Sequence, residues 1–281
     1  MKYYFTSILI FLFLTPCFSQ SNDDSFILKN KVKEVRIYDS KNKLVSLTKY
    51  NSKGLLEFTC NDNFGGSTFL KTSLTKVYDE KGVLIKTIHN HSSFKEPTIW
   101  LYKYDSTGNL VAILNDKNKF VFKFYYSNKN FKTKDELYNE DKITETKTYE
   151  YLEDSSIIIQ NINGDFIKNR KNITYLDKNK NEIKNESFNN DELAFQILSE
   201  YKNNRIIKKT FKENLPSEET YTYDRKNNLI NRQIFKIADG KETKTTSENY
   251  KYFKNGLIKT YTEKIYLPTN ITKYKYEYTF Y

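Results

Sequence analysis

The sequence predicts an all-β protein, an elongated antiparallel sheet of successive β-hairpins that is open or partly curled. Three observations predict this fold. First, one spacing recurs: Tyr, an acidic or amide residue, two further residues, Gly or Asn, any residue, then Leu or Ile. Second, polar and apolar residues alternate beside this spacing, as in β-strands. Third, aromatic residues make up 16% of the chain, which suits strands and argues against disorder.

The first 19 residues have the pattern of a secretory signal peptide. An apolar run at 8–14 follows a basic residue and precedes small residues. We place cleavage between Ser19 and Gln20, which leaves 20–281 as a single β-hairpin repeat domain of a secreted, periplasmic or cell-envelope protein. The apolar run is too short for a bilayer core of about 30 Å, and no later segment is apolar enough to span one.

The two cysteines predict neither a lipid anchor nor a disulfide. Cys17 follows a stretch that resembles the lipid-attachment box of bacterial lipoproteins, but Pro16 stands where that box needs a small residue. We therefore expect no lipid on Cys17. Once the signal is removed, Cys60 is the sole remaining thiol, so the exported chain closes no internal disulfide. Cys60 lies in an alternating stretch, and we expect it to be a small buried residue.

Six copies of the recurring spacing predict hairpin turns. An Asp or Asn side chain accepts hydrogen bonds from the backbone two residues on, and Gly or Asn tolerates the positive φ that such a turn needs. Each copy should therefore end one strand at its Tyr and begin the next at its Leu or Ile. The copies span residues 38–44, 50–56, 78–84, 104–110, 223–229 and 252–258, and the last copy has Phe253 in place of the acidic or amide residue.

These Tyr-Asp-x-x-Gly-x-Leu units, such as 78–84 and 104–110, resemble the YD repeats of bacterial RHS-type proteins. The copies here are irregularly spaced, and the chain is too short for a closed RHS shell. The resemblance implies an exported bacterial protein built of successive hairpins. It also implies a carbohydrate or cell-surface interaction role and no catalysis by the repeat.

The middle of the chain, 131–200, is where a helix could replace the hairpins, because 191–198 has apolar residues at mixed spacing. We favour strands, since β-branched and aromatic residues dominate and hairpin-like pairs such as 146–152 and 156–161 surround this segment. With 8 Gly, 4 Pro and no Ser- or Pro-rich linker, the sequence predicts one elongated domain.

Candidate chemistry is sparse in the sequence. His89 and His91 share one strand face, but two ligands are too few for zinc, and we expect an exposed pair. Residues 177–181 copy half of a calcium loop without its Gly and predict an Asn-rich turn. No nucleophile elbow or phosphate-binding Gly loop occurs. The sequence therefore predicts a protein that is not an enzyme and has no metal or cofactor.

The formal net charge of +11 says little about partners, because only five of the 46 basic residues are Arg and acidic blocks alternate with basic ones. We therefore expect no nucleic-acid partner. Most Tyr and Phe should pack in the core, and Trp100 and Tyr102 are the first candidates for stacking on a ligand such as a sugar ring. The alternating end at 273–281 predicts a free sheet edge and edge-to-edge self-association.

We therefore expect an exported, non-enzymatic binding or structural scaffold at the bacterial cell envelope or surface, with a polysaccharide or a surface protein as its partner. The alternative is an exported hydrolase or toxin whose catalytic site is assembled from separate hairpins. A deep pocket lined by converging carboxylates or by His89 would favour the alternative, whereas a flat or open sheet would favour the scaffold.

Overall fold

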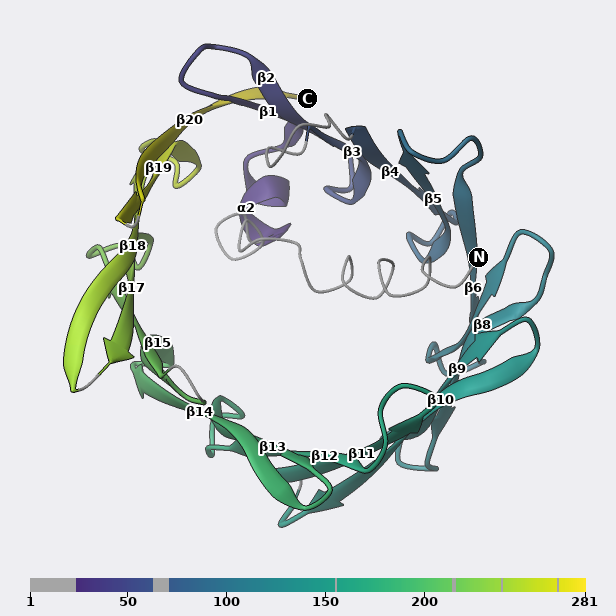
Figure 1. The fold of residues 1–281 in the computed structure, drawn as a ribbon. Helices are drawn as coiled ribbons and strands as arrows, with labels where there is room; N and C mark the ends of the chain where they lie inside the picture. The colour runs from purple at the N-terminus through teal and green to yellow at the C-terminus, as the bar shows by residue number, and fades with distance from the viewer. Residues whose placement is uncertain (1–23, 63–70, 155, 214–215, 239, 267) are drawn as a thin grey trace.

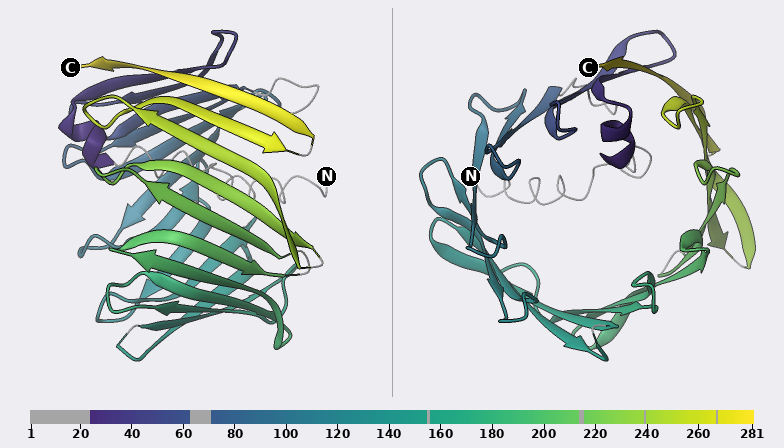
Figure 2. Two further views of the ribbon diagram at one scale, coloured as in Figure 1. Left: turned by 90° about the vertical axis from the view of Figure 1, so that its left-hand side faces the viewer. Right: turned by 180° about the vertical axis from the view of Figure 1, so that it is seen from behind.

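The protein forms a closed antiparallel β-barrel (Figures 1 and 2). The computed structural model describes residues 24–62, 71–154, 156–213, 216–238, 240–266 and 268–281. The predicted signal peptide, its cleavage site and Cys17 lie outside these residues. Among the described residues, no helix has the length and apolar character that crossing a bilayer needs.

The described residues form one short helix, α2 (Asp24–Lys29), and twenty strands in chain order. The first ten strands are β1 (Val32–Tyr38), β2 (Leu44–Tyr50), β3 (Leu56–Asp62), β4 (Lys71–Tyr78), β5 (Leu84–His91), β6 (Thr98–Tyr104), β7 (Leu110–Asn115), β8 (Phe120–Tyr126), β9 (Lys132–Asn139) and β10 (Lys142–Leu152). The other ten are β11 (Ile157–Gly164), β12 (Arg170–Leu176), β13 (Glu182–Asn189), β14 (Glu192–Lys202), β15 (Arg205–Lys212), β16 (Ser217–Tyr223), β17 (Leu229–Ala238), β18 (Lys241–Tyr252), β19 (Ile258–Tyr266) and β20 (Thr269–Phe280).

Closure of the sheet corrects one part of the prediction. Each strand pairs with its sequence neighbours, and β1 also pairs with β20, where Val35 faces Tyr278. The all-β antiparallel fold is confirmed, but the open or partly curled sheet is wrong. Strand twist accumulates over twenty strands until the two ends of the sheet meet and satisfy each other's backbone groups. The predicted free edge at 273–281 is wrong too, because β20 pairs with β1 along this segment. Edge-to-edge self-association therefore has no free strand there.

The recurring spacing forms turns at strand ends, as predicted. In the turn after β4, the Asp79 carboxylate accepts the Val83 N–H at 2.8 Å, and the Gly82 N–H donates to the Asp79 carbonyl at 3.0 Å. Gly82 has a φ of 86°, which an L residue seldom adopts. The side chains of Asp39, Asn51, Asp105, Asn115, Asp177 and Asp224 accept the same kind of bond from the residue four positions on. The half calcium loop is therefore a hairpin turn, as predicted.

The middle of the chain is entirely of this hairpin type within the described residues. The ambiguous segment 191–198 falls in β14, so the preference for strands over a helix is confirmed. Two-residue turns join several of these strands, and both residues of each turn have positive φ, as in the tight hairpin turns that match strand twist. Examples are the pairs 140–141, 190–191 and 203–204.

Tyrosines of the repeat interlock neighbouring turns at one end of the barrel, which we call the tyrosine rim: the turns that follow the even-numbered strands β2 to β18. The Tyr104 hydroxyl donates to the Leu84 carbonyl at 2.9 Å, so the Tyr of one copy binds the last residue of the preceding copy. Tyr78, Tyr126, Tyr151, Tyr223, Tyr252 and Tyr278 make the equivalent bond. This ladder explains why the spacing begins with Tyr rather than with another aromatic residue.

Helix α2 lies inside the barrel beside the tyrosine rim, as the views along and across the axis both show (Figures 1 and 2). Ile27 is fully buried and packs in one apolar cluster with Leu257 and Tyr276, which are 1% and 2% exposed. Tyr250 and Tyr261 belong to the same cluster. The side chains of this cluster therefore point into the barrel and define its inner face.

The strand register identifies which residues of the other strands point into the barrel. Residues that face each other across antiparallel strands point to the same side, and so do residues two apart on one strand. From Tyr250 this rule places Arg232, Glu219, Lys209, Ser199, Asn185, Ser187, Asn172, Gln160 and Tyr149 on the inner face. From Val35 it reaches His89, Thr87 and Trp100 in the other direction.

The outer face carries ordered Tyr–Lys–Glu triads. In one of them, Glu136 forms an ion pair with Lys134 at 2.5 Å and accepts a hydrogen bond from the Tyr125 hydroxyl at 2.7 Å. The Lys134 ammonium also lies 4.9 Å from the centre of the Tyr125 ring. Burial opposes ionisation of Glu136, but these bonds outweigh it and lower its pKa to about 2. Tyr175, Lys184 and Glu186 repeat the arrangement.

Candidate binding site on the inner wall

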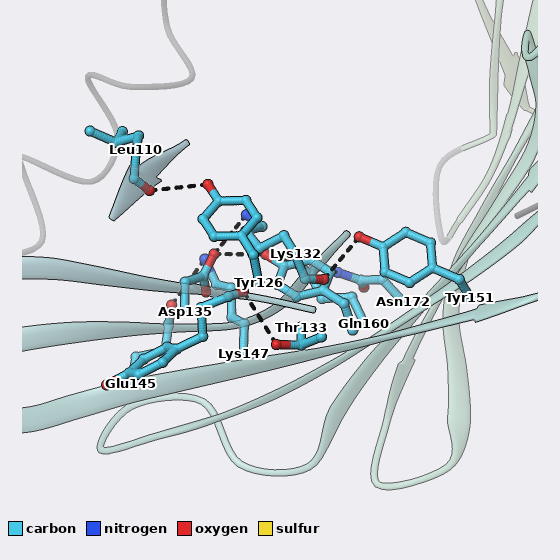
Figure 3. Close-up of polar contacts among 12 residues, drawn as sticks. Leu110, Tyr126, Lys132, Thr133, Asp135, Glu145, Lys147, Tyr151, Gln160 and Asn172 are labelled. Carbon is cyan, nitrogen blue, oxygen red and sulfur yellow. Dashed lines mark hydrogen bonds and ion pairs between the residues drawn. The ribbon is translucent and has the colours of Figure 1, made fainter. Parts of the chain in front are cut away.

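A row of polar side chains crosses the inner wall from β9 to β12 (Figure 3). The row runs in one direction: the Asn172 amide donates to Gln160 at 2.9 Å, and the Gln160 amide donates to the Tyr149 hydroxyl at 3.0 Å. The Tyr149 hydroxyl in turn donates to the Asp135 carboxylate at 2.8 Å, and this carboxylate also accepts a hydrogen bond from the Lys132 ammonium at 2.9 Å. We call Lys132, Asp135, Tyr149, Gln160 and Asn172 the polar row.

Aromatic rings hold the cationic end of the polar row in place. The Lys132 ammonium lies 4.4 Å from the ring centre of Tyr149 and 5.7 Å from that of Phe124. Burial opposes its charge, but the bonds to Asp135 and Tyr149 prevail and raise the pKa of Lys132. The Tyr151 hydroxyl donates to the Lys132 carbonyl at 3.0 Å, which ties this end to the tyrosine rim.

The polar row leaves much of its hydrogen-bonding capacity unused. Among the described residues, Asp135 accepts bonds through only one of its two carboxylate oxygens. Asn172 donates one of its two amide N–H bonds, and its carbonyl oxygen accepts none from the described residues. Ser187 faces Asn172 across β12 and β13 and is fully buried, yet its hydroxyl has no partner in the described part of the chain. Polar atoms so placed favour binding of a polar ligand.

Arg170 adds a cation beside the polar row. It lies two residues from Asn172 on β12 and therefore on the same face. Its guanidinium forms no ion pair with a described residue, and its Nε is buried without a partner among them. By contrast, Lys132 is paired with Asp135, and Lys147 is paired with Glu145 at 3.1 Å. Arg170 thus leaves this part of the wall with one uncompensated positive charge.

A second polar group on the inner wall, from β16 to β18, is closed on itself. Arg232 binds Glu219 at 2.6 Å and Glu248 at 2.9 Å, and its side chain is only 15% exposed. The Tyr250 hydroxyl donates to Glu248 at 2.8 Å, and Tyr221 donates to Glu219. Burial opposes the charge of Arg232, but the two carboxylates raise its pKa. We call Glu219, Tyr221, Arg232, Glu248 and Tyr250 the arginine cluster.

Glu263 borders the arginine cluster without joining its ion pairs. It faces Glu248 across β18 and β19, and none of the described residues donates a hydrogen bond to its carboxylate. Burial and the nearby charge of Glu248 raise the pKa of Glu263. Three carboxylates thus converge on this part of the wall, and Arg232 neutralises two of them.

The predicted ligand-binding residues lie on the inner wall as well, on β6. Trp100 is 9% exposed and lies 4.9 Å from His89 between ring centres, while the Tyr102 hydroxyl lies 3.3 Å from that of Thr87. Burial and the charge of Lys76 lower the pKa of His89, which is partly buried rather than exposed as predicted. The register puts Trp100 and Tyr102 on a different part of the wall from the polar row, and their contact with a ligand stays a prediction.

Metal ligands do not gather in the structure as far as it is described: no group of three or more His, Cys, Asp or Glu side chains there could hold an ion. Cys60 is partly exposed on β3, so the expected burial is only partial.

A pocket of about 530 Å³ lies between the turns after β2 and β4, where Lys53, Phe58 and Tyr78 contribute to its lining. The chemistry of the inner wall suits binding of a polar ligand.

Sequence reasoning missed the polar row. Its five residues come from four strands, and only the register brings them together. One signal was present in the sequence: Gln160 follows three successive Ile residues in β11, whereas Asn172 stands between Lys171 and Ile173 in β12 and is not singled out there. A polar side chain at the end of a run of β-branched residues, such as Gln160, marks a position with a specific polar partner.

Comparisons with known proteins add likenesses but no family. No family model matches the chain, and no curated protein matches it. Among solved structures, a porin-like protein from Bacteroides uniformis is 12% identical, with a TM-score of 0.39 over 89% of this chain and 97% of that chain. TcdB2-TccC3-TEV is also 12% identical, with a TM-score of 0.37 over 80% of this chain and 15% of that chain.

A third structure, TcdB2-TccC3 without its hypervariable C-terminal region, is 13% identical, with a TM-score of 0.24 over 85% of this chain and 17% of that chain. The present chain therefore spans less than a fifth of either TcdB2-TccC3 chain. At these TM-scores the likenesses assign no function, and the resemblance to YD repeats depends on the turn motif itself.

Proposed function

We propose that this chain is an exported, non-enzymatic binding scaffold of the bacterial cell envelope or surface, and that it holds its ligand inside the barrel. A polysaccharide, another surface component or a partner protein would fill this role. The observation that carries the proposal is the polar row, whose side chains are fixed by their neighbours yet keep donors and acceptors unused. Pre-oriented polar groups with free capacity are what a binding site needs.

The charged residues of the outer wall support a location of the barrel in water rather than in a membrane. A barrel that spans a membrane presents an apolar band to lipid, and a Lys at the bilayer midplane costs about 2–4 kcal/mol. Here the outward positions within the strands include Lys134, Lys184 and Lys208, each in an ion pair with a Glu. We therefore place the scaffold in the periplasm, on the cell surface or outside the cell.

The lone tryptophan offers a direct test, because Trp100 lies on the inner wall. The mature chain, from Gln20 onward, should be screened on a glycan array and against envelope extracts. Any ligand found should then be titrated while Trp100 emission and its quenching by acrylamide are followed. A ligand inside the barrel is expected to shield Trp100 from acrylamide. Binding that leaves Trp100 equally quenchable and is equally tight in Gln160→Leu, whose side chain belongs to the polar row, would contradict the proposal, as would hydrolysis of the ligand.

The alternative of an exported hydrolase has one observation in its favour, the raised pKa of Glu263 beside Glu248. A carboxyl that stays protonated at higher pH can act as a general acid. Release of reducing ends from a polysaccharide panel tests this reading, with Glu263→Gln as the control variant. Turnover by the natural chain that Glu263→Gln abolishes would establish the hydrolase, and no turnover across the panel would favour the scaffold.

A further inference from the structure

The polar row offers donors and acceptors in alternation along one line across the strands. The ammonium of Lys132 is followed by the free oxygen of Asp135, then by the free amide N–H of Gln160 and by the free N–H and carbonyl of Asn172. A hydroxyl group both donates and accepts, so a chain of hydroxyls can use every one of these atoms. A ligand that only accepts or only donates would leave about half of them unpaired at a cost in affinity.

The positive charge of Arg170 indicates that the ligand carries an anionic group. Lys132 and Lys147 are neutralised by carboxylates on the same wall, whereas the Arg170 guanidinium has no ionic partner among the described residues. Arg170 and Asn172 have Cα atoms about 7 Å apart, two residues along β12. A guanidinium fits a carboxylate through two parallel hydrogen bonds. The wall therefore offers one anion position beside a line of hydroxyl positions.

We propose that the polar row and Arg170 bind a linear acidic polysaccharide of the uronate type. Its hydroxyls pair with Asp135, Gln160 and Asn172, and its carboxylate pairs with Arg170. The proposal rests on the proposed function and assigns it a ligand class and a place on the wall.

Other classes of chain fit this wall less well. An extended peptide binds most readily by pairing with an open sheet edge, and β1 and β20 pair with each other instead of leaving one. A nucleic acid needs several cations along its phosphates, and the described residues of this part of the wall supply one that is uncompensated. A uronate chain needs both the hydroxyl line and the single cation.

The test uses the mature chain and a hexamer of polygalacturonate as the probe, with titration calorimetry as the readout. The carboxyl-reduced hexamer serves as the neutral match. Arg170→Gln is expected to weaken binding of the acidic hexamer about 10-fold or more and to leave the neutral one unchanged. Asn172→Leu is expected to weaken both. Arg225→Gln, in an exposed turn, is the matched control and should change neither.

Each remaining outcome is decisive. Equal binding of the acidic and neutral hexamers by the natural chain would overturn the role of Arg170, as would unchanged binding by Arg170→Gln at an unchanged melting temperature. Binding of an oligothymidylate with the same dependence on Arg170 would overturn the glycan class. If neither hexamer binds but another arrayed glycan shields Trp100, this inference fails while the proposed function stands. If no arrayed glycan and no envelope component binds, the proposed function fails as well.

Discussion

The polar row and the arginine cluster lie on the same inner wall, but they differ in how fully their polar atoms are used. In the arginine cluster, one guanidinium bridges two carboxylates, and each carboxylate also accepts a tyrosine hydroxyl. In the polar row, five side chains make a single line of bonds and leave donors and acceptors open. The first arrangement stabilises the barrel, whereas the second is available to a ligand.

The arginine cluster should be the most sensitive point of the barrel. Arg232→Leu leaves Glu219 and Glu248 in the wall without a counter-charge, and breaking a buried ion pair in this way costs about 3–5 kcal/mol. Urea unfolding followed by circular dichroism measures the loss. Arg225→Leu, at an exposed turn, should stay within about 0.5 kcal/mol of the natural chain. A similar small effect at Arg232 would mean that the cluster does not stabilise the wall.

Helix α2 should show the next largest effect, because it covers the inner wall at the tyrosine rim. Gly54 has a φ of 75°, and an added Cβ would meet the Leu28 side chain at 3.1 Å. Gly108 has a φ of 89°, and an added Cβ there would meet no described atom within 4 Å. Each substitution by Ala carries a backbone cost of about 1–2 kcal/mol, and Gly54→Ala also displaces α2.

The difference between the two glycine variants isolates the contact with α2. We expect Gly54→Ala to lower the free energy of unfolding by about 1 kcal/mol more than Gly108→Ala, since the Leu28 packing is disturbed only in the former. Paired thermal and urea melts of the two variants measure it. Equal losses at both positions would show that α2 is not held against the turn after β2.

The sequence was informative about local structure and silent about closure. Asp79 and Gly82 predict a turn, because the carboxylate and the positive φ act within a few residues of each other. The structure has that turn. Whether β20 meets β1 depends instead on twist and stagger summed over all the strands, which no short segment encodes. The predicted free edge failed for this reason.

The candidate site was hidden for a related physical reason. Tyr149, Gln160 and Asn172 become neighbours only through the register of β10, β11 and β12, and a slip of one residue would turn the amides to the outer face. Turn lengths set that register, so the site could have been found only after every turn between β9 and β12 was assigned. Trp100 and Tyr102 stood out because aromatic type alone drew attention to them.

The polar row itself should tolerate substitution well. Gln160→Leu removes two hydrogen bonds of the row, but Tyr149 and Asn172 are only partly buried and can bind water instead, so we expect a loss of about 1 kcal/mol or less. Gln233→Leu, on the outward face of β17, is the matched control and should lose a similar amount. The two variants should differ in ligand binding and not in stability. A loss at Gln160 as large as that of Arg232→Leu would remove the contrast between the two regions.

Glu263 should give the smallest effect and the opposite sign. Its pKa is raised in the folded chain by burial and by Glu248, so at neutral pH its ionised carboxylate destabilises the fold. Glu263→Gln should therefore be more stable than the natural chain at about pH 7, by less than about 1 kcal/mol because solvent screens a partly exposed group.

The pH dependence of this gain separates its cause from a packing change. As pH falls below the raised pKa of Glu263, the folded natural chain takes up the proton before the unfolded chain does, and its stability rises toward that of the variant. The gap should close near about pH 4, around the ordinary pKa of a Glu carboxyl at about 4.3. Urea melts of both chains between about pH 4 and about pH 8 measure it. A gap that stays constant over this range would mean that the Glu263→Gln substitution acts through packing, and that the arginine cluster already neutralises the charge of Glu248.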